Sequence, residues 1–145
     1  MRLVEIGVGA DGKSFLAAER TIDTPELAPR AVKGEVLWST TDMPAQVGAT
    51  RRAVDADWMN VGLAPSASRW MIAHFAPGHV SAMHHTSTLD YDIIIAGEVT
   101  LDTEHGSVAL YPGDCVLVPG CMHRWKVGDA GCTMATVLLG LAAAS

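Results

Sequence analysis

Short runs of alternating apolar and polar residues, separated by glycine and proline, fill most of the second half of the chain. Alternation with a period of two is typical of strands that bury one face, and Pro-Gly or Gly-Asp pairs commonly end such strands. No helix-length amphipathic stretch separates the runs, which favours an antiparallel sandwich or barrel over a βαβ fold. The strands expected from this pattern cover 69–75, 91–96, 99–103, 107–111, 115–118, 123–127 and 132–141.

The first part of the chain is less regular. A turn is expected at Gly9–Lys13, because glycine and aspartate tolerate positive φ. Residues 50–60 also allow a helical interpretation, with Val54 and Trp58 on its apolar face. We expect one domain, in which residues 1–66 pack on a barrel core at 67–145. The elements expected before the barrel are strands at 2–8, 13–20 and 35–40, a connector at 21–34 and a loop at 41–50.

Composition and charge narrow the class of protein. Of the 145 residues, 49% are hydrophobic and 18% are charged, which is typical of a globular chain and not of a disordered one. The net charge is −6, and Asp55 and Asp57 follow the pair Arg51-Arg52 directly. Because nucleic acids bind basic surfaces, we expect no nucleic-acid partner.

The cysteines and the chain ends bear on location. Cys115, Cys121 and Cys132 are an odd number without CxxC spacing, so no disulfide framework is expected. The first residues lack the apolar core of a secretory signal, and the apolar tail 134–144 is shorter than the roughly 20 residues that span a bilayer. We therefore expect a cytoplasmic protein with no membrane partner.

Candidate chemistry lies at the ends of the β-branched runs. His84 and Thr86 share a face of an extended chain, so His85 points the other way. If His84 faces the barrel interior, Asp90 and His123 are expected to join it. Two imidazoles and one carboxylate with open positions suit Fe(II), Mn(II), Ni(II) or Zn(II), and the three residues are therefore our candidate metal ligands and catalytic residues.

The same residues allow a second interpretation, in which they form a buried polar network without a metal. In that case His84 or His123 would act as a general acid or base that Asp90 orients. The other histidines are candidates whose simpler role is to pack in the core or to face solvent. A bulge would be needed to bring His85 inward, and His79 and His105 are expected to face solvent. The residues expected to line a substrate pocket are His74, Thr86, Asp92 and Trp125.

Two stretches resemble the two motifs of the cupin superfamily. The first has Gly78, His84, Thr86, Asp90 and Gly97 at the motif's spacing, and the second has Gly113-Asp114, Gly120 and His123. The strings Met83–Tyr91 and His123–Trp125 are similar to small single-domain bacterial cupins of mostly unassigned activity. Thr86 stands where the motif has its second metal histidine, and Asp90 replaces a glutamate. Whether His85 takes the place of the missing histidine is left open.

The resemblance implies a double-stranded β-helix, a jelly-roll barrel with extra N-terminal strands, and usually a homodimer. It implies a cupin that binds a small molecule, most simply a metal-dependent dioxygenase, isomerase or lyase acting on an oxygen-bearing organic substrate such as a hydroxy acid, enol, phenol or sugar-like compound. The alternative is a module that binds a ligand without turning it over, with or without metal. A dimer would hide the sheet edge near Val36–Trp38.

Overall fold

The computed structural model describes residues 2–41, 58 and 62–142, and within them the chain is built from β-strands. The strands match the expected order from the first hairpin to the last long strand. Their bounds are β1 Arg2–Val8, β2 Ser14–Thr21, β3 Val32–Thr40, β4 Ser68–Phe75, β5 Thr88–Thr103, β6 Gly106–Leu110, β7 Cys115–Pro119 and β8 His123–Gly140.

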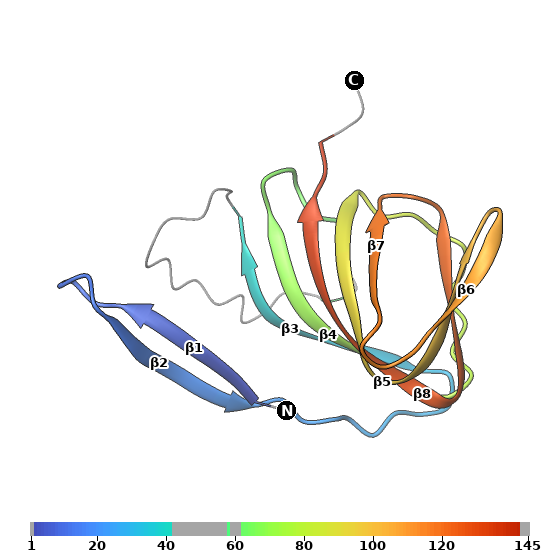
Figure 1. Cartoon of the computed structure of the whole chain (residues 1–145), viewed down its shortest axis with the longest axis horizontal. Helices are drawn as coiled ribbons and strands as arrows, with labels where there is room; N and C mark the ends of the chain where they lie inside the picture. Colours follow the sequence, from blue (N-terminus) through green and yellow to red (C-terminus); the bar gives the residue numbers. More distant parts are fainter. Residues whose placement is uncertain (1, 42–57, 59–61, 143–145) are drawn as a thin grey trace.

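The strands β3 to β8 form one antiparallel sheet that curls into a barrel (Figure 1). The order is β3-β4-β8-β5-β6, and β7 pairs with the first half of β5 on the side that β6 occupies farther along. The segment before β5 also pairs with the start of β8, through bridges at Val80–Lys126 and His84–His123. This second pairing brings the middle of the chain to the wall formed by β8.

The two longest strands differ from the sequence prediction, because each was expected as two strands. The expected turn at Gly97-Glu98 is a bulge within β5, where Gly97 has φ of 74° and the register shifts before Val99. The pairing then continues from Gly97–Cys132 to Val99–Val127, so the expected turn at Gly128-Asp129 also lies inside β8. Bulges bend a strand without ending it, which lets β5 and β8 curve around the barrel.

The first two strands form a hairpin that pairs only with itself and lies apart from the barrel (Figure 1). Its base is fixed to β3 by an ion pair of 2.6 Å between Arg20 and Glu35. Directly after the hairpin, Ile22 is buried against Leu37 and Ile72 on the outside of the sheet. The connector therefore covers one outer face of the barrel.

The main core lies inside the barrel, as the alternation predicts. Along β5, Ile94 and Val99 are buried, whereas Ile93 and Ile95 point outward and are about 40% exposed. The opposite wall contributes Met134 from β8. Inward and outward side chains thus alternate along the strand, as expected. Beyond the apolar core, the inward positions carry polar side chains.

Three further expectations concern the cysteines, membrane-spanning segments and the segment 41–60. All three cysteines are free, as predicted. No helix in the described part of the chain has the length and apolar character needed to cross a membrane. The possible helix at 50–60 and most of the loop at 41–50 lie outside the described residues.

Candidate functional site

A cavity of about 340 Å³ opens inside the barrel. Its lining joins residues that the chain carries on β3, β4, β5 and β8 and on the segment before β5. Six of the seven residues predicted for the site line it, namely His84, Thr86, Asp90, Asp92, His123 and Trp125. The other lining residues are Val32, Trp58, Met71, Ala73, Phe75, His79, Ser81, Met134, Thr136 and Leu138.

The two candidate histidines stand side by side at one end of this cavity. Their ring centroids are 4.4 Å apart. The Nδ1 of His84 lies 2.8 Å from the carbonyl oxygen of Ala82, and the Nδ1 of His123 lies 2.9 Å from that of Cys121. Because a carbonyl only accepts, each Nδ1 carries a proton, and Nε2 is the nitrogen that has a lone pair in the neutral form of each ring. Burial lowers the pKa of His123, which favours the neutral ring that binds metals or accepts protons.

Asp90 faces the same space from β5. Burial raises the pKa of its carboxyl, and the Thr88 hydroxyl and the nearby imidazoles of His123 and His84 act in the opposite direction. One oxygen, Oδ1, is buried without a hydrogen-bond partner. Thr86 is buried beside it, with its hydroxyl 2.7 Å from that of Thr88. An orphaned carboxylate oxygen is costly in a protein interior, so Asp90 is set to bind something that the chain itself does not supply.

Asp92 lies two residues farther along and also faces inward. The pKa of Asp92 is raised to about 7, mainly by burial; a hydrogen bond from Thr136 opposes this shift, and the nearby Asp90 adds to it. Its Oδ2 also lacks a partner. Near neutral pH this carboxyl is thus poised between its protonated and charged forms, as a group that exchanges protons requires.

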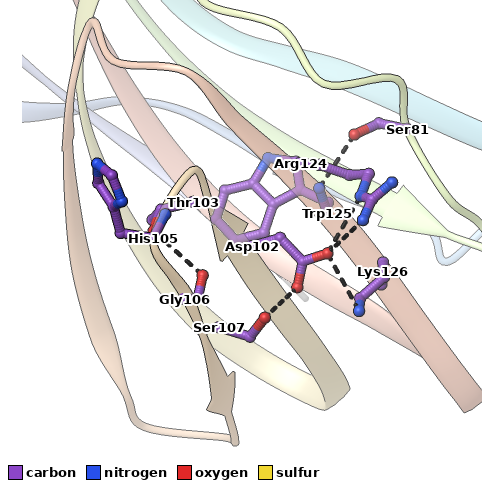
Figure 2. Close-up of polar contacts among 9 residues, drawn as sticks. All are labelled: Ser81, Asp102, Thr103, His105, Gly106, Ser107, Arg124, Trp125 and Lys126. Atoms are coloured by element: carbon purple, nitrogen blue, oxygen red, sulfur yellow. Dashed lines mark hydrogen bonds and ion pairs between the residues drawn. The ribbon is translucent and has the colours of Figure 1, made fainter.

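A polar cluster on the outside of the barrel holds the strand end that carries His123 (Figure 2). Asp102 of β5 accepts hydrogen bonds from Ser107 at 2.6 Å and Arg124 at 2.7 Å, and Lys126 lies 3.1 Å away. Arg124 therefore points away from the cavity, as its position next to His123 predicts. The ring of Trp125 lies inward and edge-on to His123, with centroids 5.6 Å apart.

The backbone N–H of Trp125 donates to the hydroxyl of Ser81 at 3.0 Å (Figure 2). This bond joins β8 to the segment that carries His84. Together with the cluster around Asp102, it fixes the wall on both sides of the two histidines.

Of two further histidines, His74 lies elsewhere than the sequence suggested, whereas His85 faces outward as strand alternation predicted. The predicted pocket residue His74 does not line the cavity: it is on the outer face of β4, under the connector, with Nδ1 3.1 Å from the hydroxyl of Thr133. Strand alternation puts Ala73 and Phe75 inward, so His74 must point outward. His85 is exposed and does not join the lining.

His79, expected to face solvent, does line the cavity. Its Nδ1 lies 2.8 Å from the carbonyl oxygen of Arg30, and its ring centroid is 5.2 Å from that of Phe75. Directly before it, Gly78 has a φ of 70°, a left-handed conformation that the sequence alone does not specify. Sequence reasoning also missed Ser81 and Thr136.

The donor atoms fit a divalent transition metal by type. Two neutral imidazole nitrogens and a partnerless carboxylate oxygen are the ligands that such ions take. Their spacing does not form a metal centre as it stands, since no three His, Cys, Asp or Glu side chains of the described residues are arranged to hold an ion. Metal binding at His84, Asp90 and His123 would therefore need side-chain movement, for example rotation of Asp90.

The barrel matches solved structures of cupins. The structure of KdgF from a Halomonas species aligns with a TM-score of 0.56 at 14% identity, covering 84% of this chain and 89% of that one. A cupin superfamily protein from Desulfitobacterium hafniense aligns with a TM-score of 0.52 at 17% identity, covering 79% and 83%. At these identities the likeness concerns the fold, and the chain has the cupin double-stranded β-helix that its two motifs predicted.

Sequence comparison adds partial matches. No family model matches the chain. The phomopsin biosynthesis cluster proteins C' and D of Diaporthe leptostromiformis are each 35% identical to it over 63 residues, which is 43% of this chain. The match spans 33% of the length of each relative, so it covers about a third of those proteins.

Proposed function

We propose that the protein is a metal-dependent cupin enzyme that acts on a small oxygen-bearing organic molecule in the barrel cavity. The observation that carries the proposal is the convergence of His84, His123 and Asp90 on one end of that cavity, where Asp90 Oδ1 is buried without a hydrogen-bond partner. Dioxygenase, isomerase and lyase reactions all remain within the proposal.

Each residue has a role that follows from its position. His84 and His123 would hold the ion together with Asp90, and a bound divalent metal would supply Lewis-acid polarisation of a substrate oxygen. Asp92, which faces the same cavity without binding the ion, would exchange a proton with the substrate. Trp125 would pack against the substrate body, and Thr86 leaves room where a longer side chain would reach inward.

The alternative is a binding module that captures a ligand without metal or turnover. The spacing of the described donors, which forms no metal centre as it stands, is the observation that favours it. In a metal-free enzyme, His84 or His123 would act as a general acid or base that Asp90 orients.

Metal analysis separates these possibilities. The purified protein is stripped with a chelator, reloaded in turn with Fe(II), Mn(II), Ni(II) and Zn(II), and analysed for metal after desalting. We expect about one ion per chain, lost in His84→Ala and His123→Ala and kept in the matched control His105→Ala, which lies in the exposed turn after β5. Unchanged metal content in both cavity variants, or none in the wild type, would overturn the metal-dependent proposal.

We also propose that the chain forms a homodimer. Among the described strands, β3 lies at an edge of the barrel sheet, and the β1–β2 hairpin pairs only with itself. Isolated hairpins are marginally stable and free edges invite pairing, so both features favour a partner copy. Light scattering should give a dimer mass, and a monomer across the concentration range would contradict the proposal. The cytoplasmic location stays a prediction.

A further inference from the structure

We propose that the cavity selects substrates that are uncharged in solution, with an apolar body and a hydroxyl group at one end. Of the substrate classes expected from the sequence, phenols and enols fit this description, whereas hydroxy acids and sugar-like compounds do not. The inference rests on the proposed function in taking the same cavity as the site. It concerns what the cavity binds and not which reaction follows.

Most of the cavity wall is apolar. Aromatic and aliphatic side chains from β3, β4 and β8 face the space opposite the histidines, so a ligand reaching past the polar end meets hydrocarbon. Burying an apolar ligand surface here is favourable, whereas burying sugar hydroxyls without partners is costly. The apolar lining residues are Val32, Trp58, Met71, Ala73, Phe75, Trp125, Met134 and Leu138.

The polar end of the cavity has buried acceptor oxygens that lack a hydrogen-bond donor. Asp90 Oδ1 and Asp92 Oδ2 are both buried and have no partner from the chain. An ionised carboxylate oxygen only accepts, so a hydroxyl or similar donor on the ligand would satisfy Asp90 Oδ1. A molecule without a donor would leave this oxygen desolvated and unpaired.

An anionic ligand has no counter-charge in the wall. Among the described lining residues there is no lysine or arginine, and the acidic groups Asp90 and Asp92 add only negative charge when ionised. On β8, Arg124 and Lys126 are on the outside of the barrel and bind Asp102 (Figure 2). The buried Arg69 of β4 does not line the cavity. In the metal-free protein a free carboxylate or phosphate would therefore be buried without a counter-charge, which is unfavourable.

The volume sets the size of the ligand. About 340 Å³ lies near the lower end of the range for small-molecule pockets. It has room for a single ring with a short substituent, and not for an oligomer. The ligand class is thus a small hydroxylated ring or enol, neutral until it reaches the site.

Three matched probes test the charge preference by isothermal titration. The probes are para-propylphenol, para-hydroxyphenylacetate and tyramine, which share a phenol ring and differ in the charge of the tail. With the phenol hydroxyl at the carboxyl groups, a charged tail would lie against the apolar wall and lose its hydration. We therefore expect the neutral phenol to bind at least about tenfold more tightly than either charged probe. The methyl ether para-propylanisole, which lacks the hydroxyl donor, should bind about tenfold more weakly than the phenol.

Two variants test whether para-propylphenol binds in the cavity. Met134→Ala removes part of the apolar wall and should weaken para-propylphenol several-fold, whereas Val108→Ala, which lies on an exposed strand outside the cavity, should not. Titrations are run on chelator-treated and on zinc-loaded protein. If no metal binds but the neutral preference holds, the metal proposal fails and this one stands. Equal or tighter binding of the anion or the amine by the chelator-treated protein, or no binding of any probe in either form, overturns the inference.

Discussion

The imidazole rings of His84 and His123 lie with centroids 4.4 Å apart and their planes tilted by 50°. Their backbones are joined in both directions, since the N–H of each donates to the carbonyl of the other at 2.9 and 2.8 Å. This pairing fixes two residues from distant motifs in one wall. The rings are therefore positioned before any ligand arrives, which is the arrangement that a functional site needs.

The carboxyl of Asp92 should make stability depend on pH. Its pKa is raised from 3.8 to about 7 by burial, so the folded state holds a proton that the unfolded state releases. Stability contributed by this group is thus full below about pH 4 and is lost as the pH rises toward 7. Asp92→Asn in chelator-treated protein should be more stable than wild type at pH 8, by on the order of a few kcal/mol.

Urea unfolding at pH 5 and pH 8 measures this difference. The exposed Asp129→Asn serves as the control, because it removes a carboxylate outside the cavity. A wild-type stability that does not fall across this range, together with no gain in Asp92→Asn at pH 8, would contradict the assignment.

The Asp102 cluster should stabilise the fold with the opposite pH dependence. Hydrogen bonds from Ser107 and Arg124, and the nearby Lys126, hold the pKa of Asp102 well below its usual range. The stability it contributes is present above the pKa of an unfolded aspartate and is lost as the pH falls below that value. Asp102→Asn should lower the Tm at pH 7, and its difference from wild type should shrink by pH 3. A constant difference across this range would argue against the ion pairs.

The bulge at Gly97 should tolerate no side chain. Its φ of 74° is left-handed, and an added Cβ would collide with the carbonyl oxygen of Gly131 on β8. Gly97→Ala should cost at least about 2 kcal/mol of unfolding free energy. Gly106→Ala, where a Cβ meets open space, should change it by less than about 0.5 kcal/mol. Equal effects in denaturant titrations would show that the bulge is not tightly packed.

Spacing and alternation predicted much of the site. The period of two put His84 with Thr86 and His123 with Trp125, and all four line the cavity. The same rule could not place His74, because each alternate set of the run 69–75 combines large apolar residues with one polar residue, so the sequence does not say which set faces inward. There the outer face is covered by the connector around Ile22, which is a tertiary contact.

The predicted ends of the strands at Gly97-Glu98 and Gly128-Asp129 were wrong for a related reason. Gly97-Glu98 and Gly128-Asp129 carry turn residues, and a bulge uses the same residues as a turn. Only the pairing of β5 with β8 on both sides of these glycines distinguishes the two. His79 was missed because its approach to the cavity depends on the path after Gly78, which no local pattern specifies.

Anomalous diffraction from crystals of the zinc-loaded protein tests the central claim most directly. The account predicts one strong zinc peak in the barrel, bonded to Nε2 of His84, Nε2 of His123 and a carboxylate oxygen of Asp90, with nitrogen distances of about 2.0–2.1 Å. A barrel without such a peak at saturating zinc, or a peak held by histidines outside the cavity, would contradict it.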